Sequence, residues 1–457
     1  MTSVRRPRPL TRAIVQALAL LVLVAAGAGA SPAELRDAHG IRVETARQLD
    51  SRQLDVRVST RALQRPVDVR ILLPDDYDTA THRQYPVLYL FHGTSGRASD
   101  WVNFGRAVET TAGLPLIVVM PDAGFDGDGG GWFADWFNGG AGGPPMWETF
   151  HIEQLLPWID TNLRTVATRA GRAVAGLSQG GFGALSYAAR HPDLFTSVAA
   201  FSGGCVIDGD PEAIATATAI IRYTTTELSG VDDPDAIFGP RDTQELNWKA
   251  HDPGTLVTNL RGMQVELWTG DGNPGPLDAG HVDPAASTIE VITFGATQRF
   301  DRYLAAAGIS HGYHYYGAGT HTFGYWARDL EEYVGPLMRR FRSHAPRPRA
   351  IGFLSTDDRW QRWGWQVEQR PPEPGFVQLS RARKSGFVIA GAGRATVRTA
   401  AFYRPGARVR VTKRSGATVS SREMTVGASG RVRVPVVLSS DATPGTTRVA
   451  IRQVGAP

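Results

Sequence analysis

The sequence predicts an α/β protein with a largely parallel central sheet, followed by a smaller domain of antiparallel strands. Three observations support this prediction. Between residues 41 and 340, short apolar segments typical of strands alternate with helical segments. The segment 116–120 is apolar at every position, as expected for a strand that helices cover on both faces of the sheet. Beyond residue 350 the helical pattern ends, and strand-like runs alternate with turns that contain glycine or proline.

The α/β part contains seven predicted strands and four predicted helices. Each strand is a short, mainly apolar run, and the helices lie between the strands or after the last one. The predicted strands are 67–73, 87–91, 116–120, 173–177, 198–202, 265–269 and 313–316. The predicted helices are 148–163, 181–190, 288–307 and 325–341.

A Gly-x-Ser-x-Gly pattern at residues 176–180 connects the strand 173–177 to the helix 181–190. A serine at such a sharp turn adopts a strained backbone conformation, which glycines on both sides make sterically possible. Its hydroxyl then projects above the sheet, where a substrate can reach it. The strand, turn and helix together predict a nucleophile elbow at Ser178 and, with the alternating pattern, the α/β-hydrolase fold.

A serine nucleophile in this fold needs a histidine base that comes later in the chain. His321 lies in a loop after the last predicted strand and just before a helix, so that its side chain can reach over the sheet edge to Ser178. His311 and His314 compete for this role, but they fall just before or within that strand and fit a structural role. We therefore expect His321 to be the base.

Backbone amides that stabilise an oxyanion are expected next to the strand 87–91. His92 and Gly93 follow this strand, at a position where such amides arise in this fold. The amides of Thr94 and Gln179 are the expected pair. Each donor of this kind lowers the barrier by about 3–4 kcal/mol.

The carboxylate that orients the histidine has several candidates. Asp271 follows the strand 265–269, where this fold often carries its acid, and Asp278 and Asp283 lie in the loop beyond it. Glu290 lies near the start of the next helix. Position alone favours Asp271, whose alternative interpretation is a surface turn residue.

The amino terminus has the features of an export signal. Four arginines precede an apolar segment at 13–26, which ends in Ala28-Gly29-Ala30, a cleavage pattern of small residues. This apolar run is short for a membrane span, and no later segment approaches the roughly 20 apolar residues that a spanning helix needs. We expect residues 1–30 to be a signal peptide and the mature protein to be secreted, without a transmembrane segment.

Cys205 is the single cysteine, so the fold must rest on its core rather than on an intramolecular disulfide. We expect it to be a buried structural thiol. The sequence contains no paired Cys and His cluster for zinc, no phosphate-binding GK[ST] motif and no EF-hand spacing. We therefore predict no metal, no cofactor and no nucleic acid partner.

The chain divides by charge as well as by pattern. Residues 351–457 contain 18 Lys and Arg against 6 Asp and Glu, whereas residues 31–350 contain 27 against 38. The segment 344–350 breaks the last helical pattern and predicts a linker between a catalytic domain at 31–343 and a basic, sandwich-like β-rich domain at 351–457. Such asymmetry favours attraction between the domains or retention on an anionic surface such as a cell wall; the alternative is that the arginines merely solvate strand faces.

Two groups of tryptophans are candidates for substrate contacts. The glycine-rich insert 126–131 precedes Trp132 and Trp136, which we expect to wall the substrate pocket. Three further tryptophans between 360 and 365 have two interpretations. They form either a sugar-stacking platform or, as is more usual, a surface that packs against the neighbouring domain.

Residues from about 55 to 340 resemble the antigen 85 mycolyltransferases and their relatives in the wider esterase D group, which includes S-formylglutathione hydrolases and feruloyl esterases. The resemblance implies Ser178 as nucleophile and His321 as base, in agreement with the elbow pattern and with the loop position of the histidine. It moves the acid to Glu290, which stands where the family carries its acidic residue. The matching stretches are Trp147-Glu148-Thr149-Phe150, Gly176-Leu177-Ser178, His191-Pro192, Phe238-Gly239-Pro240, Asp252-Pro253, and Gly319-Thr320-His321 with Tyr325-Trp326.

The resemblance implies an acyl-enzyme on Ser178, formed from an acyl ester donor, whose acyl group passes to a sugar or glycerol hydroxyl or to water. In the mycolyltransferases an arginine follows the oxyanion-loop leucine. Here Ser95 follows Thr94 and Arg97 stands two positions later, which weakens any transfer of trehalose specificity. The C-terminal domain lies outside the resemblance. The alternative function is an extracellular carboxylic ester hydrolase of the esterase D or feruloyl esterase type, with water as its only acceptor.

Overall fold

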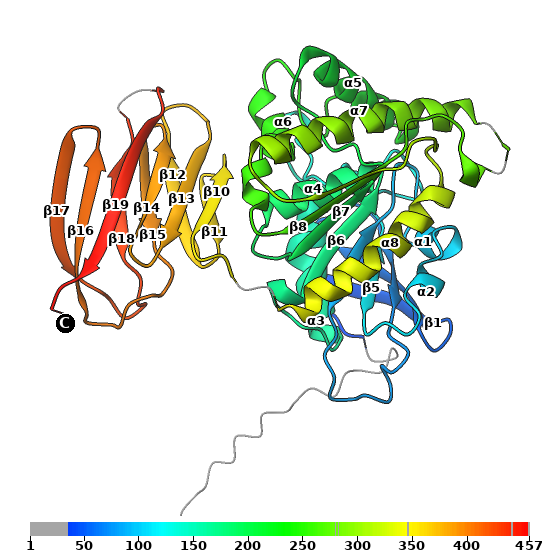
Figure 1. Cartoon of the computed structure of the whole chain (residues 1–457), viewed down its shortest axis with the longest axis horizontal. Helices are drawn as coiled ribbons and strands as arrows, with labels where there is room; N and C mark the ends of the chain where they lie inside the picture. Colours follow the sequence, from blue (N-terminus) through cyan, green and yellow to red (C-terminus); the bar gives the residue numbers. More distant parts are fainter. Residues whose placement is uncertain (1–34, 279, 282, 345–346, 440–441, 456–457) are drawn as a thin grey trace, which may run out of the picture.

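The computed structural model describes residues 35–278, 280–281, 283–344, 347–439 and 442–455. The predicted export signal at 1–30 lies outside these residues. We call residues 35–344 the α/β region and residues 347–455 the β region. Figure 1 shows the first as a sheet with helices on both faces and the second as a compact arrangement of strands beside it. No helix in the described part of the chain is long and apolar enough to cross a membrane.

The large sheet has nine strands in the order β1-β2-β3-β5-β4-β6-β7-β8-β9. The pairs β1-β2, β2-β3 and β3-β5 are antiparallel. All the other pairs in this sheet are parallel. Parallel pairing brings the carboxyl ends of β4, β6, β7 and β8 to one edge, where this class of fold places its site. The strands are β1 (Ile41–Gln48), β2 (Gln53–Thr60), β3 (Val67–Leu72), β4 (Val87–Phe91), β5 (Ile117–Pro121), β6 (Arg172–Leu177), β7 (Ser197–Phe201), β8 (Gln264–Thr269) and β9 (Gly312–Tyr315).

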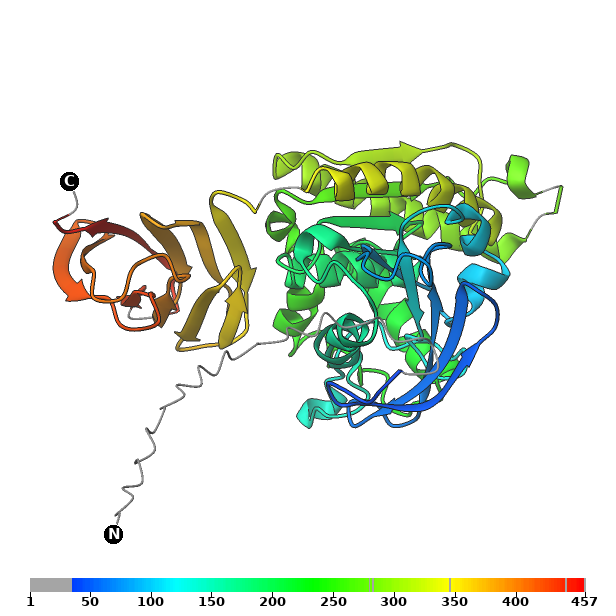
Figure 2. The same cartoon turned by 90° about the horizontal axis from the view of Figure 1, so that it is seen from below.

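Helices cover both faces of this sheet (Figure 2). In β4, Val87, Tyr89 and Phe91 belong to the core that α3, α4 and α7 cover, whereas Leu88 and Leu90 belong to the core under α1, α2 and α8. The alternation follows from the pleat of the strand, since successive side chains point to opposite faces. The helices are α1 (Asp100–Asn103), α2 (Ala107–Thr110), α3 (Leu156–Asn162), α4 (Gln179–Arg190), α5 (Pro211–Tyr223), α6 (Glu245–His251), α7 (Pro284–Ala306) and α8 (Phe323–Arg342).

All seven predicted strands are present, and each end lies within one residue of its predicted position. The helix predicted at 148–163 is α3 preceded by a π-helical turn, Thr149–Leu155. Helix α7 begins four residues earlier than predicted, because Asp283 accepts hydrogen bonds from two first-turn amides and Pro284 occupies the first helical position. Neither β1 nor β2 was among the predicted strands. Strand β1 is exposed over most of its length and carries no apolar run, whereas β2 buries every second residue from Leu54 to Val58.

The β region contains two antiparallel sheets that enclose a core of their own. Val409 and Val411 are buried while Arg408 and Arg410 are exposed, as the strict alternation of valine and arginine predicts. One sheet has the order β10-β13-β14-β19-β16-β17, with β10 (Ile351–Ser355), β13 (Val377–Arg383), β14 (Gly386–Gly391), β16 (Arg408–Ser415), β17 (Thr418–Thr425) and β19 (Gly445–Gln453). The other has the order β11-β12-β15-β18, with β11 (Arg359–Arg362), β12 (Trp365–Arg370), β15 (Arg394–Arg398) and β18 (Arg433–Val437).

The two regions are joined by specific polar contacts. The side-chain amide of Asn259 donates to the Leu354 carbonyl at 2.9 Å, and its oxygen accepts from the Leu354 amide at 2.8 Å. The Trp363 amide donates to Asp193 at 2.8 Å. The three tryptophans between 360 and 365 are at most 8% exposed and belong to the core of the β region itself, which is not an open sugar-stacking platform. Of the three, Trp363 also meets the α/β region, where Arg169 lies over its ring at 5.0 Å.

Candidate active site

Ser178 lies between the end of β6 and the start of α4, with φ 53° and ψ −122°. A Cβ on Gly176 would lie 2.3 Å from the Gly180 carbonyl oxygen, and a Cβ on Gly180 would lie 2.3 Å from that of His92. Neither position therefore accepts a side chain. The glycines on both sides of the serine are required by close backbone approach, and the geometry is that of a nucleophile elbow.

His321 and Glu290 are in direct contact. The Nδ1 atom of His321 lies 2.8 Å from Oε2 of Glu290, which is fully buried on α7. The His321 backbone amide donates to the Ala286 carbonyl at 3.2 Å, so the loop between β9 and α8 is fixed to the same helix. Because Nδ1 faces a carboxylate, it carries the proton, and Nε2 has the lone pair. Among the described residues, that buried Nε2 has no hydrogen-bond partner.

The Glu290 carboxylate is held by four further donors. Its Oε1 accepts from the Ser202 hydroxyl at 2.9 Å, the Thr269 hydroxyl at 3.1 Å and the Gly270 amide at 2.8 Å. Its Oε2 also accepts from the Thr293 hydroxyl at 3.3 Å. Burial acts to raise the pKa of Glu290, but these hydrogen bonds and His321 outweigh it and lower the pKa, so the group stays ionised.

The other acidic candidates contact different partners. Asp271 accepts from the Tyr315 hydroxyl at 3.1 Å and from the Asn273 amide at 2.9 Å, as a turn residue does. Asp278 accepts from the Tyr325 hydroxyl at 2.8 Å, and Asp283 caps α7. Among these carboxylates, Glu290 is the one that contacts His321.

The competing histidines are likewise engaged elsewhere. His311 lies 2.7 Å from Asp301, and His314 lies 3.0 Å from Glu266 while its ring stacks on Trp268. Cys205 is fully buried, and burial raises the pKa of its thiol to about 12. A thiol in this state is not a nucleophile at neutral pH.

The loop after β4 is fixed by His92. The Ala123 amide donates to Nε2 of His92 at 2.9 Å, so Nδ1 carries the proton and donates to the Gly93 carbonyl at 2.7 Å. Burial lowers the pKa of His92, which favours this neutral form. A Cβ on Gly93 would lie 3.0 Å from the Cβ of Ser178, so the loop lies directly against the elbow.

Thr94 and Gln179 are brought together beside the elbow. The Gln179 side-chain amide donates to the Thr94 hydroxyl at 3.1 Å and to the Gly129 carbonyl at 2.9 Å. Gly130 packs on the same side chain, since a Cβ there would lie 2.2 Å from Oε1 of Gln179. The glycine-rich insert is therefore a close-packed support for Gln179.

Trp132 and Trp136 follow this insert in the chain and are largely buried, at 5% and 7% exposed. Trp132 Nε1 donates to the Thr224 hydroxyl at 2.8 Å, and Trp136 Nε1 donates to the Gly131 carbonyl at 3.2 Å. Their predicted role as walls of the substrate pocket stays a prediction. Within the described ranges, no group of three or more His, Cys, Asp or Glu side chains is arranged to hold a metal ion.

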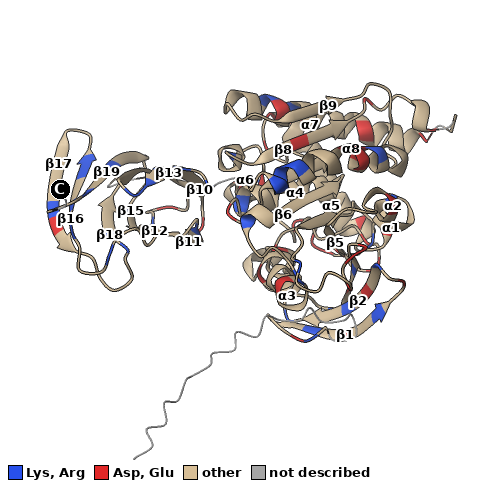
Figure 3. Cartoon of the chain, turned by 60° about the horizontal axis from the view of Figure 1, so that its bottom comes forward, with Lys and Arg blue, Asp and Glu red and all other residues tan. Residues whose placement is uncertain are grey.

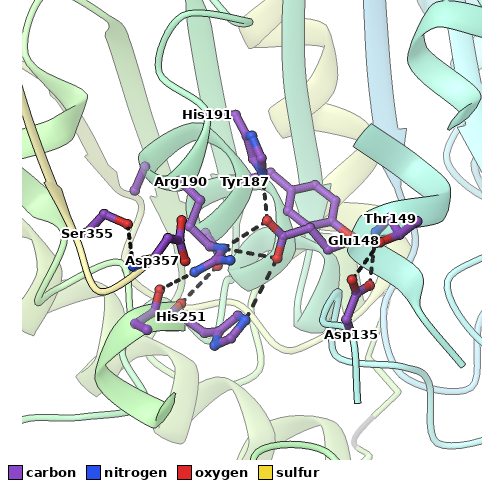
Figure 4. A network of polar contacts seen from close by, with 12 residues as sticks. Asp135, Glu148, Thr149, Tyr187, Arg190, His191, His251, Ser355 and Asp357 are labelled. Atoms are coloured by element: carbon purple, nitrogen blue, oxygen red, sulfur yellow. Dashed lines mark hydrogen bonds and ion pairs between the residues drawn. The ribbon is translucent and has the colours of Figure 1, made fainter. Parts of the chain in front are cut away.

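Two of the sequence stretches that carry the family resemblance meet at the far end of α4 rather than at Ser178 (Figure 4). The buried Glu148 accepts from Nε of Arg190 at 2.9 and 3.0 Å and lies 2.6 Å from Nε2 of His191. The attractions of Arg190 and His191 outweigh burial and hold the pKa of Glu148 well below its usual range. These stretches therefore anchor the helix that begins directly after Ser178.

No motif in the sequence identifies Ser202 and Thr269 as hydroxyl donors to Glu290. Ser202 follows β7 and Thr269 ends β8, so both lie at the carboxyl edge of the sheet, beside the elbow. That shared position is the one signal in the sequence that points to them. The residues alone did not show that their hydroxyls converge on one carboxylate 21 to 88 positions away.

Comparison with known proteins agrees with this architecture. A family model described as Putative esterase matches residues 60–337. The chain belongs to this family. Esterase Rv1288 of Mycobacterium tuberculosis is 36% identical over 320 residues, which cover 69% of this chain and 64% of the relative. The Diacylglycerol acyltransferase/mycolyltransferase Ag85B of Mycolicibacterium smegmatis is 30% identical over 261 residues, which cover 55% and 76%.

A solved structure of a similar protein supports the fold of this chain. MPT51 of Mycobacterium tuberculosis superposes with a TM-score of 0.52 at 23% identity, over 64% of this chain and all of that one. The α/β-hydrolase fold is thereby confirmed. The chain spans less than two thirds of the length of esterase Rv1288, and the relatives are esterases and acyltransferases by name.

Proposed function

We propose that this chain is a secreted serine acyltransferase or esterase that forms an acyl-enzyme on Ser178. As the Ser178 oxygen attacks an ester carbonyl, His321 Nε2 takes its proton, and Glu290 stabilises the imidazolium that results. The 2.8 Å contact between Glu290 and His321 is the observation that carries this proposal, because it fixes the tautomer that leaves Nε2 as a base.

The amides of Thr94 and Gln179 are the proposed oxyanion donors. Gln179 follows Ser178 directly, and its side chain contacts Thr94 at 3.1 Å, which keeps the two residues together. The His92 hydrogen bonds hold the loop that carries Thr94. Donors fixed in this way need no reorganisation as charge develops on the carbonyl oxygen.

The tetrahedral intermediate then breaks the bond to the donor alcohol, which leaves with the proton from His321. A second hydroxyl attacks the acyl-enzyme while His321 takes its proton. The bond between the acyl carbon and the Ser178 oxygen then breaks, and His321 returns the proton to that oxygen. If this hydroxyl belongs to a sugar or glycerol, the enzyme is an acyltransferase, as the name of the Ag85B relative indicates for that protein. If it is water, the enzyme is an extracellular carboxylic ester hydrolase, as the name of the Rv1288 relative suggests.

The two functions are separated by product analysis. Purified mature protein and its Ser178→Ala variant are given a chromogenic short-chain ester with and without trehalose or glycerol, and acyl products are identified by mass. We expect acylated sugar or glycerol from the wild type, and a loss of about 10⁶-fold in kcat from Ser178→Ala. Free acid alone, unchanged by the acceptor, identifies the hydrolase. Wild-type turnover in Ser178→Ala contradicts the proposal as a whole.

The β region supports a further part of this proposal, retention on an anionic cell-envelope polymer. It contains a cleft of about 510 Å³ whose apolar lining includes Trp365 and Phe402, with four cations around it. None of these four forms a salt bridge with an acidic residue in the described ranges, whereas Glu368 and Glu423 pair with arginines elsewhere. In Figure 3, little of the ribbon of this region is coloured red, the colour of Asp and Glu. The cations are Arg347, Arg349, Arg383 and Lys384.

Retention is tested on dextran sulfate resin against neutral dextran resin. Replacing Arg349, Arg383 and Lys384 by Gln should lower the salt concentration that elutes the protein, since each lost cation weakens the attraction to a polyanion. The control replaces three exposed arginines outside the cleft and removes the same total charge. Equal elution of both variants contradicts a role for the cleft. The control positions are Arg394, Arg422 and Arg448.

A further inference from the structure

One short segment, residues 201–204, contacts both the proposed nucleophile and the proposed acid. It begins with the last residue of β7, the strand next to the one that ends at the elbow. The Ser178 amide donates to the Phe201 carbonyl at 3.0 Å, and the Gly204 amide donates to the Ser178 carbonyl at 3.2 Å. Both peptide groups of the nucleophile are therefore bound by the same segment.

Ser202, between these two contacts, bonds the acid. Its hydroxyl donates to Oε1 of Glu290 at 2.9 Å, and its own amide donates to the Trp268 carbonyl at 2.8 Å. The residue is fully buried, with φ 46°. A non-glycine residue in the left-handed region is strained, and such strain concentrates at functional sites. Glycine would relieve the strain but would remove the hydroxyl.

The donors on Glu290 are divided unevenly between its two oxygens. Three of them, from Ser202, Thr269 and Gly270, reach Oε1, whereas Oε2 receives His321 and the longer contact from Thr293. A carboxylate oxygen accepts about two hydrogen bonds through its lone pairs, so Oε1 is fully occupied. The carboxylate is thereby held with Oε2 towards the histidine.

We propose that segment 201–204 holds both Ser178 and Glu290 in place, and that Ser202 is the positioning residue that sets the distance between them. The inference rests on the proposed function, because it assigns roles relative to that triad. Backbone contacts fix the nucleophile on one side of Ser202, and its hydroxyl fixes the acid on the other. Ser202 touches no reacting atom and acts through Glu290.

Two variants of Ser202 separate the hydroxyl from the backbone strain. Ser202→Ala and Ser202→Gly both remove the donor, but only Gly relieves the positive φ. We expect both to lower kcat by a similar factor of about 10–100 with KM little changed, since a small misplacement of catalytic groups costs about 100-fold. Ser202→Gly should have a higher Tm than Ser202→Ala, because glycine adopts the positive φ without strain. The matched control is Ser197→Ala, a buried serine at the other end of β7 that bonds Tyr333 and should keep wild-type kcat.

A double-mutant cycle distinguishes positioning from general destabilisation. If Ser202 acts through Glu290, Ser202→Gly should cause at most a twofold further loss in the Glu290→Gln protein. Full additivity overturns the inference, as does wild-type kcat in both Ser202 variants when Ser178→Ala is inactive. If Ser178→Ala itself remains active, the proposed function fails first, so the two failures are distinguishable.

Discussion

Arg362, on β11 of the β region, donates from Nε to the carbonyl oxygen of Arg190 at 2.8 Å, at the end of the helix that begins beside Ser178. The last carbonyls of a helix lack partners within it, and a cation there also complements the helix dipole. Arg362 further donates to Nδ1 of His191 at 3.0 Å. Because a guanidinium only donates, Nδ1 of His191 carries no proton and accepts. The proton of this neutral ring is on Nε2, which donates to Glu148.

This contact predicts that the β region stabilises α4. Arg362→Ala should lower the free energy of unfolding by about 2 kcal/mol, since it leaves buried acceptors without a charged donor. It should change kcat less than threefold, because Ser178 lies about 18 Å along the helix at 1.5 Å per residue. Urea unfolding measures the change. Arg359→Ala, with a side chain that is 76% exposed and paired to Glu368, should cost under about 0.5 kcal/mol. Equal effects would contradict the prediction.

Glu290 and Asp271 give opposite predictions for kcat. Glu290→Gln should lower kcat by about 10³–10⁴-fold, because the amide no longer stabilises the imidazolium or fixes the tautomer of His321. Asp271→Asn should keep wild-type kcat, since Asp271 bonds Tyr315 and Asn273. Steady-state hydrolysis of a chromogenic ester measures both. The reverse pattern would restore Asp271 as the acid.

Stability should depend on pH through His151. Burial lowers the pKa of His151 to about 3, whereas a histidine in an unfolded chain has a pKa of about 6.5. Between these values the unfolded chain binds a proton that the native protein does not, so this stability is present above pH 6.5 and is lost as the pH falls. The advantage of wild type over His151→Gln should shrink by about 2 kcal/mol between pH 6.5 and 4.5.

Urea unfolding of both proteins at several pH values measures this difference. Other buried groups titrate as well, such as Asp329, whose pKa burial raises to about 8. They titrate in both proteins and therefore largely cancel in the comparison. A difference in unfolding free energy that stays constant with pH would contradict the assignment.

The glycine-rich insert should matter for catalysis through Gln179. Gly130→Ala places a Cβ 2.2 Å from Oε1 of Gln179, at a φ of 80°. We expect it to lower kcat by about 10–100-fold, part of the 10²–10³ that loss of an oxyanion donor costs. Gly142→Ala has a φ of 65° with open space around the new Cβ, so it shares the strain without the displacement. Equal kcat in the two variants would show that the insert does not act on Gln179.

The individual strands and the elbow could be predicted because both depend on local patterns. An apolar run between turns specifies a strand such as β5 without reference to the rest of the chain. Gly176 and Gly180 mark a close backbone approach that few other residues allow. Strand β1 was not predicted because it has no apolar pattern of its own. Its pairing with β2 makes it a strand.

The sequence by itself determined the fold, the elbow serine and the place of His321, since each is specified by residues close together in the chain. Position alone favoured Asp271 as the acid, the family resemblance favoured Glu290, and no pattern gave a role to Ser202. Only the tertiary structure decided which carboxylate meets His321, and which hydroxyls hold that carboxylate. The physical reason is that these contacts join residues 31 and 88 positions apart, so they exist only after the packing of α7 against the sheet has set the distances.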